Sequence, residues 1–235
     1  MQQLVHCEAI GEVELSIGVN DLILQPSLRY LQAGEKHSHV QHIIIQRPFR
    51  EHSIPELPFG PHMLGMELNT IQQSNEFLKA AIGKPLQTFG LVSARLDEEG
   101  MELLSVVLKN PQLKSIKLWL LSFPDPSCMA HMLSLMADLD ELQELHLSDL
   151  GSQPEEIIHF RRLMEKHKLY KLRLWRSQLS QEICDAMAVN LQLNTLEIRF
   201  IPATAEVIGC LAGALTECTS LRKLTLRGWR GEDTE

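Results

Sequence analysis

A hydrophobic pattern recurs six times in the second half of the chain. Six segments align without gaps, and each has an apolar residue at its first, fourth and sixth places. They are LQTFGL, LKSIKL, LQELHL, LYKLRL, LNTLEI and LRKLTL, starting at Leu86, Leu113, Leu142, Leu169, Leu193 and Leu221. All 18 of these places are apolar, 15 of them leucine, and the starts lie 27, 29, 27, 24 and 28 residues apart. On a β-strand the fourth and sixth places point to one side, and the third and fifth to the other. The pattern therefore predicts six strands that share one buried face.

A helix is predicted between successive strands of this set. The predicted helices cover residues 96–110, 127–139, 154–168, 180–190 and 203–218. Four of them open with residues that suit a helix start, namely Ser127, Pro154, Ser180 and Thr204. A strand that returns through a helix pairs in parallel with the strand before it. One such unit buries its apolar face only against neighbouring units. We therefore expect a stack with parallel strands on a concave side and helices on a convex side.

The repeated pattern resembles the leucine-rich repeat family, in particular its long, ribonuclease-inhibitor-like subclass with units of about 28 residues. The resemblance covers residues 86–231 and implies an α/β solenoid. The family usually places Asn or Cys three residues after the sixth place, where the side chain bonds exposed backbone groups. This chain has Ala94, Leu121, Leu150, Ser177, Ile201 and Trp229 there. Of these six residues, only Ser177 is expected to bond the exposed backbone groups in place of Asn. Either water and other backbone atoms satisfy these groups, or the loops are less regular than in the family.

Residues 1–62 are expected to form an N-terminal flank, and residues 63–235 the repeat domain. The flank contains GEVELSI (residues 11–17), whose alternation is typical of a half-buried strand. Four prolines follow in a loop, at Pro48, Pro55, Pro58 and Pro61. The flank is either a cap over the first repeat or a partner-binding loop. Segments that start at residues 40 and 63, with a helix near residues 75–82, are candidates for one or two degenerate earlier repeats.

Composition favours a soluble protein that acts in the cytoplasm. The chain is 44% hydrophobic and carries a net charge of −8, which argues against nucleic acid as the main partner because phosphates favour a basic surface. Its 5 cysteines include no CxxC pair and are expected to be buried free thiols in a reducing compartment. No apolar run is long enough to span a membrane, and the N-terminus lacks the features of a signal peptide.

No motif for catalysis or for cofactor binding is present. The phosphate-binding loop, the dinucleotide-binding glycine turn, the nucleophile elbow and HExxH are all absent, so we expect no cofactor and no enzyme activity. Two local groups represent the competing interpretation. Glu35, His37, His39 and His42 include ligands suited to zinc. Cys128 and His131, three residues apart on a predicted helix, could touch as a thiol and its base.

The concave face combines basic and aromatic residues. The third, fifth, seventh and eighth places of the six segments hold 7 Lys or Arg and 3 acidic residues, the reverse of the bias of the whole chain. Two of the 3 tryptophans also fall there, and Trp and Arg are enriched in binding hot spots. The predicted binding residues are Trp119, Trp175, Lys117, His146, Arg173, Arg176, Arg199, Phe200 and Arg227.

The spacing of the two indoles is a specific expectation. Neighbouring strands lie about 5 Å apart, so Trp119 and Trp175, two strands apart, should be separated by about 10 Å. Small Ser148 lies between them and would leave a shallow notch. The alternative is that both indoles pack sideways on neighbouring repeats and have a structural role.

These features predict a protein–protein interaction module. Its concave groove would bind a partner with an acidic surface patch, in the role of an inhibitor, an adaptor or a substrate-recruiting subunit. The short, degenerate repeats are also similar to those of proteins that bacterial pathogens deliver into host cells. The alternatives are an enzyme with an unrecognised site in the flank or groove, and a nucleic-acid binder that uses the basic stripe. The oligomeric state is not predicted.

Overall fold

The computed structural model describes residues 14–18, 42–46, 62–66, 68, 70–151, 153–166, 169–201 and 204–227. Nine strands form one open sheet in sequence order, and every neighbouring pair is parallel. The strands are β1 (Glu14–Gly18), β2 (His42–Gln46), β3 (His62–Met66), β4 (Thr88–Val92), β5 (Ser115–Trp119), β6 (Glu144–Ser148), β7 (Lys171–Trp175), β8 (Thr195–Arg199) and β9 (Lys223–Arg227). This arrangement confirms the α/β class and the parallel pairing of the six predicted strands.

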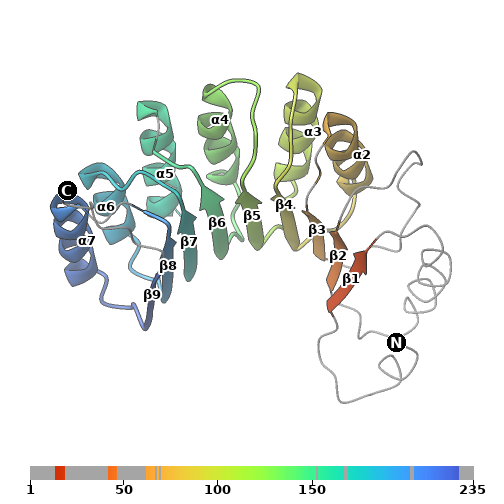
Figure 1. Cartoon of the computed structure of the whole chain (residues 1–235). Coiled ribbons are helices and arrows are strands. Elements are labelled where there is room, and N and C mark those ends of the chain that lie inside the picture. Colours follow the sequence, from red (N-terminus) through yellow and green to blue (C-terminus); the bar gives the residue numbers. More distant parts are fainter. Residues whose placement is uncertain are drawn as a thin grey trace, which may run out of the picture.

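Six helices alternate with the strands from β3 onward. They are α2 (Ile71–Ala81), α3 (Glu98–Leu108), α4 (Ser127–Met136), α5 (Pro154–Lys166), α6 (Gln181–Ala188) and α7 (Ala205–Glu217). The whole stack is curved, with the sheet on its inner side and the helices on its outer side (Figure 1). Each helix packs against the next along the stack. The chain therefore forms a repetitive, solenoid-like layer of helices around a concave sheet.

The apolar places of the repeat form the core between the two layers. In β4 to β8 the fourth and sixth places are buried almost completely, as are the first-place leucines from Leu86 to Leu193. The strands themselves start two residues after those leucines. The last repeat differs, because Leu224 and Leu226 of β9 are 42% and 43% exposed. No described helix follows β9 to cover them.

Side-chain caps account for most of the helix starts. Ser180 accepts a bond from Ile183 N at 3.4 Å, and Thr204 accepts one from Val207 N at 3.2 Å, so both cap helices as predicted. The prediction that Ser127 caps its helix is wrong. Ser127 is the first helical residue, and its N–H donates to Asp125 Oδ1 at 2.7 Å.

Helix α2 starts four residues before the predicted start at Asn75. Thr70 and Gln73 form a capping box, in which each side chain accepts a bond from the backbone N–H of the other, at 3.2 and 3.1 Å. This motif fixes the helix start one turn earlier than the apolar pattern indicates. The motif T-x-x-Q is legible in the sequence and was the missed signal.

The residue directly after each of the strands β4 to β8 has a left-handed backbone conformation. Five consecutive repeats place a non-glycine residue at φ between 51° and 58°: Ser93, Leu120, Asp149, Arg176 and Phe200. Such residues cost roughly 1 kcal/mol or more each. Four of the five donate their N–H to the carbonyl at the seventh place of the next strand, at 2.9 or 3.0 Å. These bonds hold adjacent repeats in register at the ends of their strands.

Residues 1–62 contain two whole strands, β1 and β2, and His62 is the first residue of β3. Strand β1 falls on the alternating segment GEVELSI, and β2 and β3 match the expected earlier strands near residues 40 and 63. Both β1 and β2 continue the same parallel sheet. The four prolines lie outside the described residues, and the division of the chain at residue 62 stays a prediction.

Two further expectations concern the whole molecule. Cys128, Cys184, Cys210 and Cys218 are free and buried, whereas Cys7 lies outside the described residues. Among the described helices, none combines the length and the apolar character that a membrane span requires.

Candidate functional site

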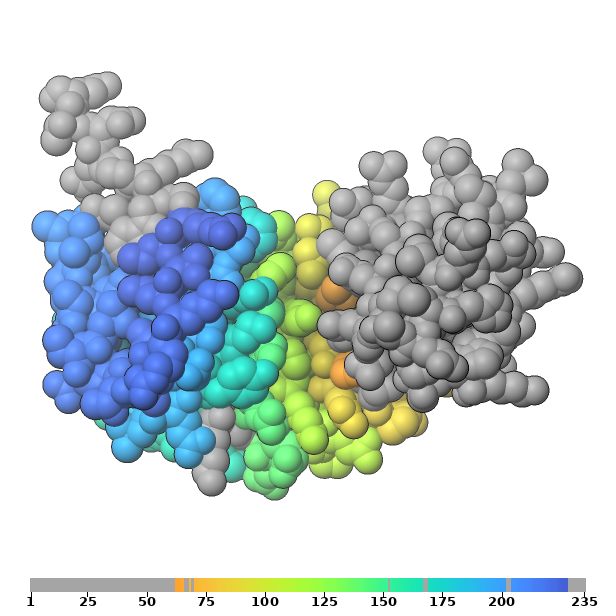
Figure 2. Space-filling view, turned by 90° about the horizontal axis from the view of Figure 1, so that it is seen from below, coloured from red at the N-terminus to blue at the C-terminus, as the bar shows by residue number. Residues whose placement is uncertain are grey.

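The concave face carries a row of contacting aromatic rings across four repeats. Trp119 of β5 stacks on His146 of β6, with ring centroids 5.4 Å apart, and meets Trp175 of β7 edge-on at 5.5 Å. Trp175 in turn stacks on Phe200, which follows β8, at 5.5 Å. We call Trp119, Trp175 and Phe200 the aromatic row. Figure 2 looks onto this side of the molecule, which is hollowed over the middle strands.

The expected gap of about 10 Å between the two indoles is wrong. The side chains of Trp119 and Trp175 lean toward each other above Ser148, so their centroids are only 5.5 Å apart. Ser148 is buried beneath them. The indoles therefore fill the predicted notch instead of lining it. Both rings are only partly buried and still form part of the surface.

His146 was predicted as a contact residue, but it is 1% exposed and cannot reach a partner directly. Neither ring nitrogen has a hydrogen-bond partner among the described residues, and Glu144 Oε2 lies 3.8 Å from Nε2. Burial, with the nearby charges of Arg173, Lys117 and Lys171, lowers the pKa of His146 to about 2. The imidazole is therefore neutral and supports Trp119 from below.

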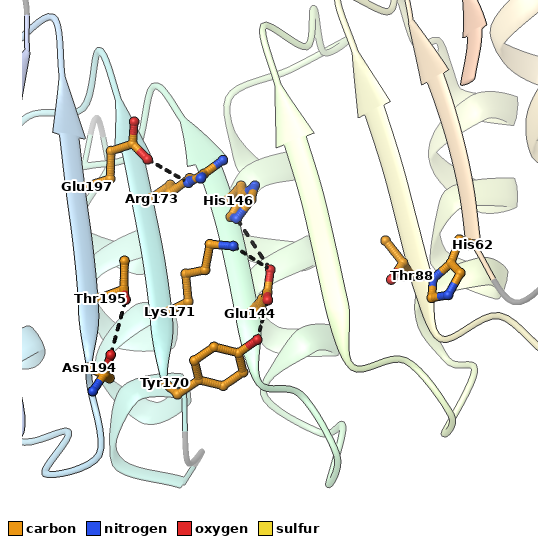
Figure 3. Close-up of polar contacts among 10 residues, drawn as sticks. All are labelled: His62, Thr88, Glu144, His146, Tyr170, Lys171, Arg173, Asn194, Thr195 and Glu197. Carbon is orange, nitrogen blue, oxygen red and sulfur yellow. Dashed lines mark hydrogen bonds and ion pairs between the residues drawn. The ribbon is translucent and has the colours of Figure 1, made fainter. Parts of the chain in front are cut away.

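Two arginines share one buried carboxylate beside the aromatic row. Arg173 Nε lies 2.7 Å from Glu197 Oε2, although its N–H is not aimed for a hydrogen bond, and Arg199 pairs with the other oxygen, Oε1. Glu197 is buried, whereas both guanidinium groups are about one-third exposed. Figure 3 shows Arg173 and Glu197 on adjacent strands of the same face. The group keeps one net positive charge.

The other two acidic residues of this face are also paired. Arg176 donates to Asp149 Oδ1 at 2.8 and 2.9 Å. Lys171 Nζ lies 3.2 Å from Glu144 Oε2, and Tyr170 donates to Glu144 Oε1 (Figure 3). The Glu144 hydrogen bond, with a smaller effect of burial, raises the pKa of Tyr170 to about 12.

The concave face keeps an excess of positive charge although its acidic residues are paired. Burial alone would raise the pKa of Glu144, but the bonds from Tyr170 and Lys171 hold it below its ordinary value, so the group stays charged. With 7 basic and 3 acidic residues at these places, four positive charges remain in excess. Lys117 is half-buried, and Arg227 is exposed at the end of the sheet. The face therefore stays basic in a chain whose net charge is −8.

The two groups suggested for catalysis fare differently. Glu35, His37 and His39 lie outside the described residues, and of His42 only the backbone is described. Across the residues that the structure describes, no group of three or more His, Cys, Asp or Glu is placed to hold a metal ion.

Cys128 and His131 are each engaged elsewhere. Cys128 Sγ donates to Asp125 Oδ2 at 3.3 Å, while His131 Nε2 lies 3.2 Å from Ser105 Oγ. Burial raises the pKa of the Cys128 thiol, which opposes formation of a nucleophilic thiolate. The structure therefore does not bring these two side chains together as a thiol and its base.

The sequence matches no protein-family model and no curated protein. The candidate site therefore rests on its own geometry. Of the predicted binding residues, the aromatic row and its bordering arginines lie together on the concave side, while His146 lies beneath them. Trp229 lies outside the described residues.

Proposed function

We propose that this chain is a leucine-rich repeat protein that binds another protein on its concave face. The family is supported by the six segments with apolar first, fourth and sixth places, by the parallel strand order and by the outer helices. The observation that carries the binding role is the aromatic row. Three large rings pack edge to face and face to face on the solvent-facing side of the sheet, and each of them stays partly exposed.

The partner is a protein segment that combines aromatic and acidic side chains. Phe200 is 48% exposed, and the indole of Trp175 stacks on it, so the row offers a continuous apolar platform. Arg173 and Arg199 border the platform with one positive charge in excess. Aromatic groups of the partner would stack on the rings, and carboxylates would meet the guanidinium groups. The protein would act as an inhibitor, an adaptor or a substrate-recruiting subunit in the cytoplasm, with host cytosol as a further candidate setting.

A displayed library of random peptides tests this proposal. The library is first cleared on the double variant Trp119→Ala/Trp175→Ala and then selected on the natural protein. We expect recovered peptides to be rich in Asp or Glu together with Trp, Tyr or Phe. The double variant should bind them at least about 30-fold more weakly, because hot-spot residues contribute about 2 kcal/mol or more.

Matched variants separate the site from general effects. Trp175→Phe keeps a ring against Phe200 and should retain most of the affinity. Arg199→Ala should weaken binding, whereas Arg161→Ala removes an equal charge from the surface of α5, where Arg161 pairs with Glu165. Because the rings contact each other, each variant is first checked for folding by circular dichroism. Recovery of basic peptides, or of peptides that bind the double variant equally well, would contradict the proposal.

Two other classes of function are alternatives to protein binding, and the peptide experiment bears on the first of them. A nucleic acid that displaces the peptides with a steep salt dependence would favour the basic stripe as a phosphate-binding surface. An enzyme is the other class, and no arrangement among the described residues favours it.

A further inference from the structure

The stack is interrupted between β5 and β6. In the other repeats from β4 to β8, the residue after each strand donates its N–H to a backbone carbonyl of the next repeat. Leu120 instead donates to the side-chain oxygen of Ser148, at 2.7 Å. Strand pairing here also ends at Leu118 and Leu147, one residue short of the neighbouring pairs.

A second bond between these repeats is replaced as well. Ser122 N donates to Ala94 O, and Gln178 N donates to Leu150 O, each linking one loop to the loop before it. The equivalent N–H of Gly151 turns to Glu156 Oε2, at 2.7 Å. Side chains thus satisfy both donors, and the two loops separate.

The connection that follows β5 is longer than its counterparts. Seven residues lie between β5 and α4, against five between each other strand and helix from β4 to β8. The extra length forms a wide loop beside α4 (Figure 1). In this loop Phe123 is partly buried against the core, and Asp125 holds the end of the loop by accepting bonds from Ser127 and Cys128.

A cavity of about 300 Å³ opens between these separated loops. Its apolar walls are formed by Leu118, Leu121, Phe123 and Met129. Three carboxylates also line it: Asp125 from the loop, Asp149 directly after β6 and Glu156 from the first turn of α5. None of the described lining residues is basic.

We propose that this cavity binds one lysine or arginine side chain of the partner protein. The apolar walls suit the aliphatic stem of such a side chain, and the carboxylates suit its charged head. The volume lies at the lower end of the range for small-molecule sites, roughly 300 to 1,000 Å³, so it suits one side chain better than a cofactor. Three carboxylates also disfavour phosphate-bearing ligands.

Two of the carboxylates are positioned for this role. Glu156 lines the cavity while its Oε2 accepts the bond from Gly151 N, so a cation that enters the cavity would meet a fixed carboxylate. Asp149 receives both bonds from Arg176 on the single oxygen Oδ1. The cavity also adjoins the concave face. Ser148, which precedes Asp149 and lines the cavity as well, pairs in register with Trp175 of the aromatic row. A partner lying on the aromatic row would thus reach the cavity with a neighbouring basic residue. This inference rests on the proposed function for the source of the side chain.

Amino-acid probes test the cavity without the partner. The full chain is titrated with N-acetyl-arginine amide and with N-acetyl-lysine amide, while NMR follows the methyl groups of Met129 and Leu121. N-acetyl-citrulline amide, the uncharged isostere of arginine, is the matched probe. We expect saturable shifts at both methyl groups with the two cationic probes, and none with citrulline at the same concentrations.

Charge-matched variants complete the test. Glu156→Gln keeps an acceptor for Gly151 N and should weaken arginine binding about tenfold, the loss expected when a hydrogen bond loses its charge. Glu141→Gln removes an equal charge from an exposed position and should change nothing. If Glu156→Gln does not fold, Asp149→Asn replaces it, because asparagine tolerates φ of 58°.

Three outcomes would overturn the inference: no saturable shift, equal shifts with citrulline, or equal losses in Glu156→Gln and Glu141→Gln. The proposed function is judged separately, by the effect of Trp119→Ala/Trp175→Ala on selected peptides. Failure of either experiment leaves the other interpretable.

Discussion

Strands β6 and β9 carry the same apolar pattern but have different surroundings. In β6, which has a paired strand on each side, Leu145 and Leu147 are fully buried. In β9, Leu224 and Leu226 occupy the equivalent register positions and are 42% and 43% exposed. The helix layer shows the same contrast, because α4 has a neighbour on each side, whereas α7 has α6 alone among the described helices. A repeat motif therefore specifies which side chains face the core, while burial depends on the repeat that follows.

The largest predicted effect comes from shortening a leucine in each of the two strands compared above. Leu145→Ala should lower the free energy of unfolding by about 2 to 5 kcal/mol, because it leaves a cavity in a packed layer. Leu224→Ala removes the same atoms from an exposed strand and should cost less than about 1 kcal/mol. Urea unfolding followed by circular dichroism measures both. Equal losses would mean that the end of the stack is covered in solution.

The next effect comes from the buried imidazole of the middle repeats. The folded pKa of His146 is about 2, below the ordinary 6.5, so its contribution to stability is complete above pH 6.5 and is lost as the pH falls toward 2. At pH 4.5 the loss should be about 2 to 3 kcal/mol. The fifth place of β9 holds Thr225, which has no such dependence.

His146→Phe isolates this contribution. The phenyl ring keeps the stack on Trp119 and removes two nitrogens that lack partners among the described residues. We expect the variant to be at least as stable as the natural protein at pH 7, and clearly more stable at pH 4.5. Urea unfolding at the two pH values measures the difference. An unchanged acid sensitivity in the variant would show that other groups cause it.

The sequence predicts the layers of this fold well because they follow from periodicity alone. Apolar places two residues apart specify strand faces, and helix-capping residues such as Ser180 and Thr204 specify where helices start. Deviations from the pattern were harder to foresee. The left-handed conformation of Leu120 and Phe200 is not apparent from residue type, because bulky side chains rarely adopt it.

The candidate site was predictable in position but not in detail. Strand alternation places Trp119, Trp175 and Arg173 on one face. Strand alternation does not show how far the side chains lean. It therefore does not predict that the indoles contact each other and that Trp119 covers His146. The cavity beside α4 depends on two side-chain acceptors, Ser148 and Glu156, that replace backbone ones. Such exchanges arise from tertiary contacts and leave no periodic trace in the sequence.

The smallest predicted effect concerns α7, the last described helix, and it tests whether the helix layer ends there. Gly209 and Gly213 lie one turn apart on the exposed side of α7, and a methyl group added at either would meet nothing within 4 Å. Alanine loses less backbone entropy than glycine in a helix, so Gly213→Ala should raise the free energy of unfolding by about 0.5 to 1 kcal/mol. If another element packs closely on α7 in solution, the added methyl group would meet it and lower stability instead. Measured beside Leu224→Ala, the sign of this change tells whether both layers end at the last described repeat. A stabilised Gly213→Ala with a nearly neutral Leu224→Ala means an open end, whereas losses in both mean a covered one.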